Sequence, residues 1–306
     1  MPKERKSYKY SIIIPHHNIP DLLERCLSTI PKFDDIQVIV VDDTSSIENV
    51  NKIKILEQKY DKFEFLYTQM GKGAGYARNI GLEKVKGEWL LFFDADDYID
   101  RNSYYLWESV LRTSYDYDII FFKVTEVKDR TVIIERIKNK PNILDKYLRY
   151  CYTQPWGKLF SSKFIKENKI QFEDSLVAND YYFSVLSGFK ARKIKYIDDY
   201  FYHYIQREGS LCYNILEDYN RIESRLIVYD KIEKFFKSKN IHIHPCSNFL
   251  SKCYRQFNRG LNKKLKVSMR LNNINGYNLF SLFLYGCVLK IFEKILFYFK
   301  IPYYYI

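Results

Sequence analysis

The amino-acid sequence predicts an α/β fold in which a mostly parallel sheet is flanked by helices. Short apolar segments alternate with amphipathic helical segments over the first hundred or so residues, which is typical of βαβ units. One apolar segment, residues 36–41, contains a single polar residue, as expected when helices cover both faces of a parallel sheet. Polar residues follow several of these segments at their C-terminal ends, where an open parallel sheet presents groups to a ligand.

The elements follow one another in a regular order. A β-branched run that ends at a proline predicts the first strand, and leucines spaced by three and four residues predict the helix after it. The same alternation continues up to a strand that ends in two phenylalanines. The expected strands are residues 11–15, 36–41, 63–67 and 88–93, and the expected helices are residues 21–30, 49–60 and 74–85.

The chain has 306 residues, a net charge of +12, a hydrophobic share of 47%, 29 tyrosines and 22 phenylalanines. This is enough for one large domain with an extension, which we place at residues 1–215 and 216–306. The positive charge favours an anionic partner, such as phosphorylated ligands, a lipid surface or nucleic acid. Six scattered cysteines without a CxxC pair, and a polar N-terminus without a secretory signal, predict a protein of the reducing cytoplasm.

Two acidic motifs follow predicted strands. Asp42 and Asp43 come directly after the second strand, so we expect them to face the crevice above the sheet; the alternative is a loop or helix-cap role for Asp43 or Ser45. Asp94, Asp96 and Asp97 follow the fourth strand, and carboxylates this close repel one another unless a cation is near. Mg²⁺ and Mn²⁺ take carboxylate and phosphate oxygens, so this motif predicts a metal-bound diphosphate, with a solvated acidic turn as the alternative.

The glycine-rich residues 71–75 do not match the dinucleotide fingerprint GxGxxG. Tyr76 or Arg78 stands where the third glycine is needed, and the segment follows the third strand rather than the first. A NAD-binding site is therefore not expected. Flexible backbone beside Lys72 and Arg78 still suits close approach to phosphates or to a base.

Together these motifs resemble those of family 2 glycosyltransferases, whose nucleotide-sugar-binding α/β domain is called GT-A. The matching motifs are Pro15 with Asn18, Asp42-Asp43-x-Ser45, Ala77-Arg78-Asn79-x-Gly81 and Asp94-x-Asp96-Asp97, within a resemblance that covers about residues 8–210. The first two motifs line the nucleoside pocket in that family, although His17 stands here where tyrosine is frequent. The last resembles the DxD element that touches ribose and holds a divalent cation. With the nearby basic residues, the expected donor-binding residues are Pro15, Asn18, Asp42, Asp43, Lys72, Arg78, Asn79, Asp94, Ala95, Asp96, Lys158 and Arg207.

The second half of the chain carries fainter matches in the same order. Trp156-Gly-Lys158 resembles a segment near the junction of donor and acceptor. Asn179-Asp180 resembles an acidic pair, usually Glu-Asp, whose aspartate is the general base of inverting members. Here asparagine replaces the first acid and Asp180 is kept, so the resemblance implies that Asp180 is catalytic. A helix cap is the alternative for Asp180, because the residues that follow it are predicted to be helical.

Residues 202–210 look like the segment that closes over the diphosphate in that family. His203 and Arg207 are expected to assist the phosphates. The metal ligands expected for Mn²⁺ or Mg²⁺ are Asp96, Asp94 and His203. For His203, a buried histidine whose hydrogen bonds are satisfied within the protein is the alternative.

Sugar transfer needs a charge-stabilised diphosphate, a base for the acceptor hydroxyl and in-line attack. We therefore expect a metal-dependent inverting glycosyltransferase that uses a nucleotide sugar, a UDP-sugar in particular. The expected acceptor is a saccharide or a polyprenyl-diphosphate-linked sugar in surface polysaccharide synthesis. One alternative is a nucleotidyltransferase, which would usually carry a glycine-rich loop where this chain has residues 15–18. Another is a non-catalytic module that binds anionic lipid or nucleic acid, for which the aspartates would be dispensable. We expect no nucleic-acid partner.

The last third of the chain falls outside the resemblance. Residues 218–236 are predicted to be helical, and residues 234–292 contain no acidic side chain. Basic and apolar residues recur there at intervals of three and four, which predicts a basic amphipathic helix. No apolar stretch is long enough to span a bilayer, so we expect peripheral contact with the inner face of the cytoplasmic membrane. The alternatives are that this region caps the catalytic domain or forms a dimer; His242, His244 and Cys246 lack a fourth ligand for zinc.

Overall fold

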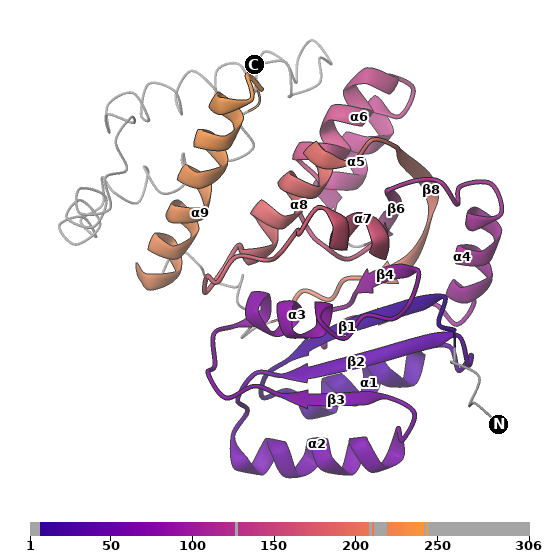
Figure 1. Ribbon diagram of the computed structural model, residues 1–306, viewed down its shortest axis with the longest axis vertical. Coiled ribbons are helices and arrows are strands. Elements are labelled where there is room, and N and C mark those ends of the chain that lie inside the picture. The colour runs from indigo at the N-terminus through magenta and orange to yellow at the C-terminus, as the bar shows by residue number, and fades with distance from the viewer. Residues whose placement is uncertain (1–6, 126–127, 208–209, 211–218, 242, 244–306) are drawn as a thin grey trace.

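The computed structural model describes residues 7–125, 128–207, 210, 219–241 and 243. This part of the chain forms a mixed eight-stranded sheet flanked by helices (Figure 1). The strands are β1 (Tyr10–His16), β2 (Ile36–Asp42), β3 (Glu64–Tyr67), β4 (Trp89–Phe92), β5 (Tyr98–Ile99), β6 (Ile119–Thr125), β7 (Lys158–Ser161) and β8 (Ile194–His203).

The strand order is β3-β2-β1-β4-β7-β6-β8-β5. The first four strands are parallel to one another, and so are β6 and β8. β7 runs antiparallel to β4 and β6, and β5 runs antiparallel to β8. The predicted α/β class with a mostly parallel sheet is confirmed, and β7 is the strand that joins its two halves.

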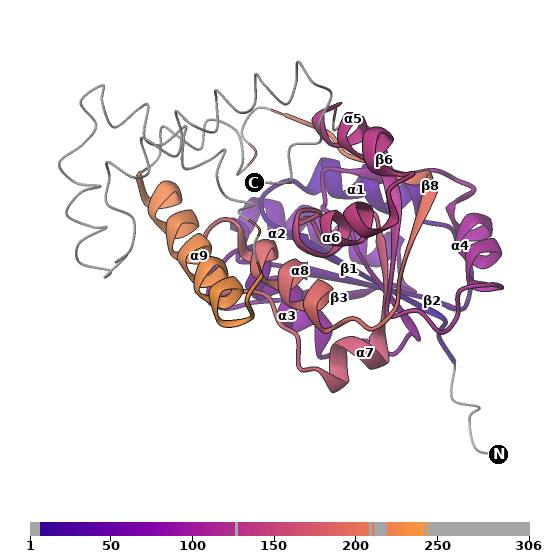
Figure 2. The ribbon, with the colours of Figure 1, turned by 90° about the horizontal axis from the view of Figure 1, so that it is seen from above.

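Helices cover both faces of this sheet. They are α1 (Pro20–Thr29), α2 (Ile47–Lys59), α3 (Ala74–Leu82), α4 (Ser103–Leu111), α5 (Lys128–Ile137), α6 (Pro141–Tyr150), α7 (Ser162–Glu167), α8 (Asn179–Lys190) and α9 (Tyr219–Ser238). α3 packs on β1 and β2 in front of the sheet, and α1 lies behind it with α2 packed beside it (Figures 1 and 2). Because both faces are covered, every residue of β1 and β2 is buried.

The predicted elements up to residue 93 are all present, with ends that differ by up to three residues at the end of α3. Fraying at helix ends and the last residues of short strands account for differences of this size. The helix predicted after Asp180 lies within α8, and the helix predicted at residues 218–236 corresponds to α9. The predicted domain boundary at 215/216 and the basic segment at residues 244–306 lie outside the described residues.

An aromatic cluster joins the two halves of the sheet. Phe92 of β4 packs edge-on against Phe160, Phe172 and Phe183, with ring centroids 5.0–5.9 Å apart. Phe172 and Phe183 are themselves stacked at 4.0 Å. Edge-on and offset stacked rings are the favourable geometries for such pairs. These contacts fix α8, which carries Phe183, against the end of β4, and they explain part of the high aromatic content.

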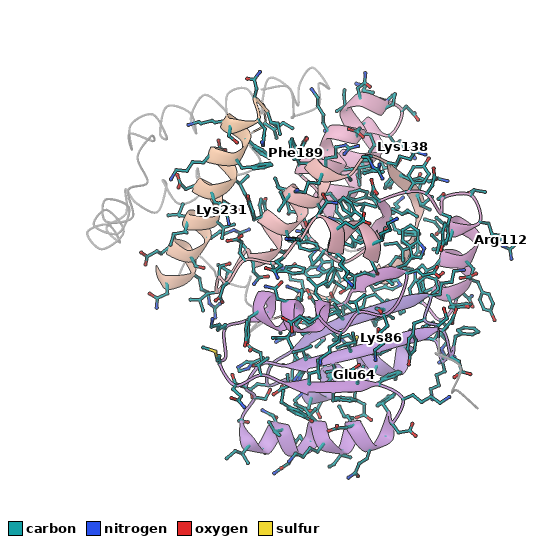
Figure 3. The ribbon with its side chains drawn as sticks, in the orientation of Figure 1. Glu64, Lys86, Arg112, Lys138, Phe189 and Lys231 are labelled. Atoms are coloured by element: carbon teal, nitrogen blue, oxygen red, sulfur yellow. The ribbon has the colours of Figure 1, made fainter. Side chains whose placement is uncertain are left out.

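α9 packs along α8 through a second apolar cluster. Val185 of α8 packs there with Val228, Ile232 and Phe236 of α9. Phe189 and Lys231, on α8 and α9, are labelled in Figure 3. The described part of the chain contains no helix of the length and apolarity needed to cross a membrane.

Candidate functional site

The carboxyl ends of β1, β2 and β4 meet at one edge of the sheet, because these strands are parallel neighbours. The two acidic motifs predicted from the sequence follow β2 and β4 at this edge. α3 packs on β1 and β2 next to this edge, and α8 packs in turn against α3. The residues that these elements place together form the candidate site.

Asp42 shapes the end of β2. Its Oδ1 accepts hydrogen bonds from His16 Nδ1 at 2.7 Å and from Ser45 Oγ at 2.6 Å. His16 Nε2 accepts from the backbone N–H of Ile19, so Nδ1 is the nitrogen that donates. Burial opposes ionisation of Asp42, but the hydrogen bonds from His16 and Ser45 outweigh it and lower the pKa of this carboxyl. Asp42 is thus engaged by protein groups that join β1 to β2.

Asp43 connects three segments of the site. Its Oδ1 accepts from Thr68 Oγ1 at 2.7 Å, and its Oδ2 accepts from the backbone N–H of Gly73 at 2.6 Å. These bonds tie the end of β2 to the residue after β3 and to the N-terminus of α3. The side-chain cap of α2 is Ser46, so the alternative role of Asp43 as a helix cap is not observed. Contact with a nucleoside base stays a prediction for Asp43.

Asn18 holds the loop after β1 against the start of α2. It adopts a left-handed backbone conformation with φ 56°, and its Oδ1 accepts from the N–H of Ser46 at 2.7 Å. Its own N–H donates to Ser45 Oγ. Pro15 is buried within β1. Asn18 and Pro15 therefore both lie at the end of β1 that borders the site. Direct contact with the donor stays a prediction for both residues.

Arg78 of α3 bridges two parts of the site. Its Nη2 donates to Asp94 Oδ1 at 2.6 Å, and its Nη1 donates to Asn179 Oδ1 at 3.0 Å. The guanidinium lies over the ring of Phe172 and is almost fully buried, and its Nε has no hydrogen-bond partner among the described residues. Arg78 thus links the turn after β4 to the first turn of α8. The replacement of an acid by Asn179 leaves this link intact, because an amide oxygen also accepts a hydrogen bond.

Asn79 holds the backbone of the segment before α8 through two hydrogen bonds. Its Nδ2 donates to the carbonyl of Phe172 at 3.0 Å, and its Oδ1 accepts from the N–H of Phe172 at 2.9 Å. Both polar atoms of the amide are therefore paired with one backbone residue. The structure supports a positioning role for Asn79, which the sequence motif alone did not distinguish from ligand binding.

Gly75 permits the close approach of α3 to this part of the chain. A methyl group at Gly75 would lie 2.4 Å from the carbonyl oxygen of Glu173 and 2.7 Å from Cβ of Asn179. We expect Gly75→Ala to lower the free energy of unfolding by about 1–3 kcal/mol, since backbone cannot move aside cheaply. Thermal unfolding measures this loss, and Glu83→Ala at the exposed end of α3 is the control. Equal stability of the two variants would contradict the packing described here.

The turn after β4 carries the remaining acids. Asp96 Oδ2 accepts from Arg207 Nε at 2.7 Å, and its carbonyl accepts from Arg25 Nη2. Burial, followed by the nearby charge of Asp94, raises the pKa of Asp96. Ala95 between them is buried. The turn therefore presents two carboxylates that are each paired with one arginine.

Asp97 and Tyr202 support this turn, and neither was among the predicted site residues. Tyr202 Oη donates to Asp97 Oδ2 at 2.5 Å and accepts from the N–H of Asp94 at 2.9 Å. Asp97 Oδ1 accepts from the N–H of Ile205. Burial, with Asp94 as the next cause, raises the pKa of Asp97 to about 8. The third acid of the sequence motif and the segment at residues 202–210 were the two signals that pointed to this pair.

The residues present fit a divalent cation that is shared with a diphosphate. Asp94 and Asp96 keep 29% and 18% of their side chains exposed, and among the described residues each pairs with an arginine through one oxygen. One or two carboxylates plus phosphate oxygens form a usual ligand set for Mg²⁺. Among the described residues, no group of three or more His, Cys, Asp or Glu side chains could hold a metal by itself.

His203 is placed with a different acid. Its Nε2 lies 3.0 Å from Asp100 Oδ1, and its ring stacks on Tyr98 at 4.6 Å. The prediction that His203 joins Asp94 and Asp96 as a metal ligand is not supported by this placement. The alternative, a histidine satisfied within the protein, describes it better.

The two predicted lysines also differ in their surroundings. Lys72 Nζ donates to Asp174 Oδ2 at 2.9 Å, so it ties the glycine loop to the chain before α8. Lys158 is buried, its Nζ donates to the carbonyl of Tyr152 at 2.7 Å, and aromatic rings surround it. This placement gives no support to a phosphate contact by Lys158, because cation–π contacts and a carbonyl engage its ammonium group.

Asp180 lies in the first turn of α8, beside the Arg78 bridge. Ala178 occupies the cap position with φ 60°, so Asp180 is not the helix cap. The side chain is partly exposed, and no hydrogen bond from another described residue reaches its carboxylate. Burial raises the pKa of Asp180; Arg78 opposes the shift and Asp94 adds to it. A carboxylate without a fixed partner and with a raised pKa is suited to accept a proton.

Comparisons with known proteins identify the family. Residues 11–172 match the family model described as glycosyl transferase family 2. The chain belongs to this family. The match includes the motifs up to Asp94-x-Asp96 and the segment Trp156-Gly-Lys158, and it ends before Asp180. The predicted family is confirmed.

Two curated relatives of this family 2 member act on the same polymer by name. The chain is 31% identical over 210 residues to poly(ribitol-phosphate) beta-glucosyltransferase of Bacillus spizizenii, covering 66% of this chain and 33% of that protein. It is 29% identical over 233 residues to poly(ribitol-phosphate) beta-N-acetylglucosaminyltransferase TarS of Staphylococcus aureus, covering 72% and 40%. The chain therefore spans between a third and two-fifths of the length of these relatives.

Solved structures show the same GT-A fold. Residues 1–349 of S. aureus TarS in complex with UDP-GlcNAc superpose with a TM-score of 0.59 at 18% identity, covering 94% of this chain and 92% of that one. The mannosyltransferase PcManGT of Pyrobaculum calidifontis, in complex with GDP-Man and Mn²⁺, has a TM-score of 0.57 at 14% identity, with 97% and 85% covered. At sequence identities of 18% and 14%, the structural similarity shows the fold of this chain alone.

Proposed function

We propose that this chain is an inverting glycosyltransferase that transfers a sugar from a UDP-sugar to a polysaccharide acceptor. The observation that carries the proposal is the Arg78 bridge. It joins the Asp94–Asp96 turn, which suits a diphosphate, to the first turn of α8, which carries Asp180. The donor-binding acids and the candidate base are thereby brought together at the carboxyl ends of the parallel strands.

The choice of donor and acceptor draws on the comparisons. UDP-GlcNAc and UDP occupy the structures of TarS, which supports a uridine diphosphate donor. Two relatives are named for transfer to poly(ribitol-phosphate), which supports a surface polymer as the acceptor. A polyprenyl-diphosphate-linked sugar is the second acceptor that we retain. No described feature favours the nucleotidyltransferase or the non-catalytic lipid- or nucleic-acid-binding alternative.

The chain's own residues supply the steps of transfer. Asp180 accepts the proton of the acceptor hydroxyl as the oxygen attacks the anomeric carbon. Arg207 and Arg78 offset negative charge on the departing diphosphate. A single displacement assisted by one base inverts the anomeric configuration. A divalent cation, when bound, would add Lewis-acid stabilisation of the diphosphate, and Asp94 and Asp96 are the residues that would hold it.

Contact with the inner face of the cytoplasmic membrane remains part of this proposal. The basic and aromatic residues that motivate it are within 244–306, outside the described residues. The net charge of +12 supports it, because cationic segments are attracted to anionic lipid.

Thermal unfolding in the presence of nucleotides tests the proposal. We expect UDP with Mn²⁺ to raise the unfolding temperature by about 5 °C at a hundredfold excess over Kd, since ligand binding stabilises the native state by mass action. EDTA should remove most of this shift, and GDP or dTDP should give less. If none of the diphosphates changes the unfolding temperature, the transferase proposal is wrong for this chain.

A further inference from the structure

Asp97 and Tyr202 connect two segments that are far apart in the sequence. Tyr202 Oη donates to Asp97 Oδ2 at 2.5 Å and accepts from the N–H of Asp94 at 2.9 Å. Asp97 Oδ1 accepts from the N–H of Ile205 at 2.8 Å. Both side chains are buried, at 1% and 0% exposed. The turn after β4 and the segment after β8 are therefore joined by three hydrogen bonds, of which the one between Asp97 and Tyr202 is fully buried.

Each of these segments carries a group that the proposed function assigns to the diphosphate. The turn after β4 carries Asp94 and Asp96, and the segment after β8 carries Arg207. The two meet directly where Arg207 Nε donates to Asp96 Oδ2 at 2.7 Å. The Asp97–Tyr202 pair lies one residue from Asp96 and five residues from Arg207. It is thus placed to set the distance between the acidic turn and the arginine.

The ring of Tyr202 is held in a fixed orientation. It stacks on Trp156 with centroids 5.3 Å apart and an interplanar angle of 5°. Trp156 stacks in turn on Tyr204 at 5.4 Å. Phe93, directly before the acidic turn, packs on Tyr202 at 5.5 Å. A side chain packed this tightly transmits its position to the groups that it bonds.

We propose that Asp97 and Tyr202 are positioning residues that hold Arg207 against the Asp94–Asp96 turn, so that both segments grip one diphosphate. The diphosphate as ligand rests on the proposed function; the hydrogen-bonded connection does not. Neither residue touches the substrate in this proposal. Their effect reaches it through the position of Arg207 against the acidic turn.

Tyr202→Phe tests the connection with little change in packing. The variant keeps the ring stack but leaves the Asp94 N–H and one Asp97 oxygen unpaired. We expect the Kd for UDP with Mn²⁺ to rise about tenfold. Asp97→Asn should act in the same direction, because an amide has one acceptor for two donors. Tyr152→Phe is the matched control, since Tyr152 Oη donates to the Phe122 carbonyl in the same core, away from the acidic turn.

A double variant separates positioning from general stability. If Tyr202 acts through Arg207, then Tyr202→Phe should add less than about twofold to the Kd in an Arg207→Gln background. A full tenfold addition would overturn the proposal, as would a UDP affinity equal to that of Tyr152→Phe. Tyr152→Phe also loses a buried tyrosine hydrogen bond, the one to the Phe122 carbonyl, so an effect through stability alone would appear in both variants.

Amide hydrogen exchange tests the connection without a nucleotide. The N–H groups of Asp94 and Ile205 should exchange about tenfold faster in Tyr202→Phe than in the unsubstituted protein, and at unchanged rates in Tyr152→Phe. Unchanged exchange at Asp94 in Tyr202→Phe would overturn the proposal. A faster rate there, together with no UDP binding by the unsubstituted protein, would keep the connection and remove the diphosphate as its ligand.

Discussion

Replacing Asp180 by asparagine is expected to leave UDP binding intact and to lower turnover by about a hundredfold to ten-thousandfold, the usual contribution of a general base. Asparagine has nearly the same shape but cannot take up the proton of an attacking hydroxyl. No hydrogen bond from another described residue depends on the Asp180 carboxylate, so the fold and the donor pocket should be preserved. Sugar transfer measured beside UDP binding separates the two effects.

Glu167→Gln provides the control for this variant. Glu167 ends α7 and pairs only loosely with Lys163, at 3.8 Å on the exposed surface. It should transfer sugar at the rate of the unsubstituted protein. An Asp180→Asn variant that matches it in turnover would remove Asp180 from the mechanism, and one that also loses UDP binding would assign it to the donor pocket instead.

The pH dependence carries a second signature of the same residue. Burial raises the pKa of Asp180 above that of an ordinary aspartate. A base must be ionised to act, so kcat/KM should fall as the pH drops through this raised pKa and should be maximal above it. The profile of Asp180→Asn should lack this acidic limb. An acidic limb at the pKa of an ordinary carboxyl would mean that another group accepts the proton.

The parallel half of the fold could be predicted because its signals are local. β1, β2 and β4 are mainly apolar runs, and the helix between β1 and β2 buries leucines and a cysteine on one side. β5 has two residues and exists only through pairing with β8, a hundred residues later. Its formation depends on tertiary contacts rather than on its own sequence pattern. The antiparallel pairing of β7 with β4 and β6 also depends on tertiary contacts and could not be predicted from its own sequence pattern.

The site was predictable to the extent that its residue types limit its chemistry. Three carboxylates directly after a buried strand favour binding of a cation over a role in the core, and the structure places Asp94 and Asp96 in the turn after β4. The surroundings of Lys158 could not be predicted, because the sequence does not show that aromatic rings and a carbonyl would lie against its ammonium group. Tyr202 was not selected because its bond to Asp97 spans 105 residues. Its role became visible only when the two segments were placed side by side.

Replacing Asp96 by asparagine is expected to abolish the metal-dependent part of UDP binding. The amide keeps one acceptor for Arg207 but loses the negative charge that a divalent cation requires. The UDP-induced rise in unfolding temperature should therefore become insensitive to Mn²⁺ and to EDTA. Thermal unfolding with UDP, with and without Mn²⁺, measures this directly.

Asp100→Asn is the matched control, since Asp100 lies four residues further along and pairs with His203 at 3.0 Å. If Asp94 and Asp96 hold the cation with the diphosphate, this variant should keep the Mn²⁺ effect in full. Loss of the effect in Asp100→Asn as well would return His203 and its partner to the metal site. Retention of the effect in Asp96→Asn would instead remove Asp96 from the metal site and leave Asp94, which is paired with Arg78, as the remaining ligand.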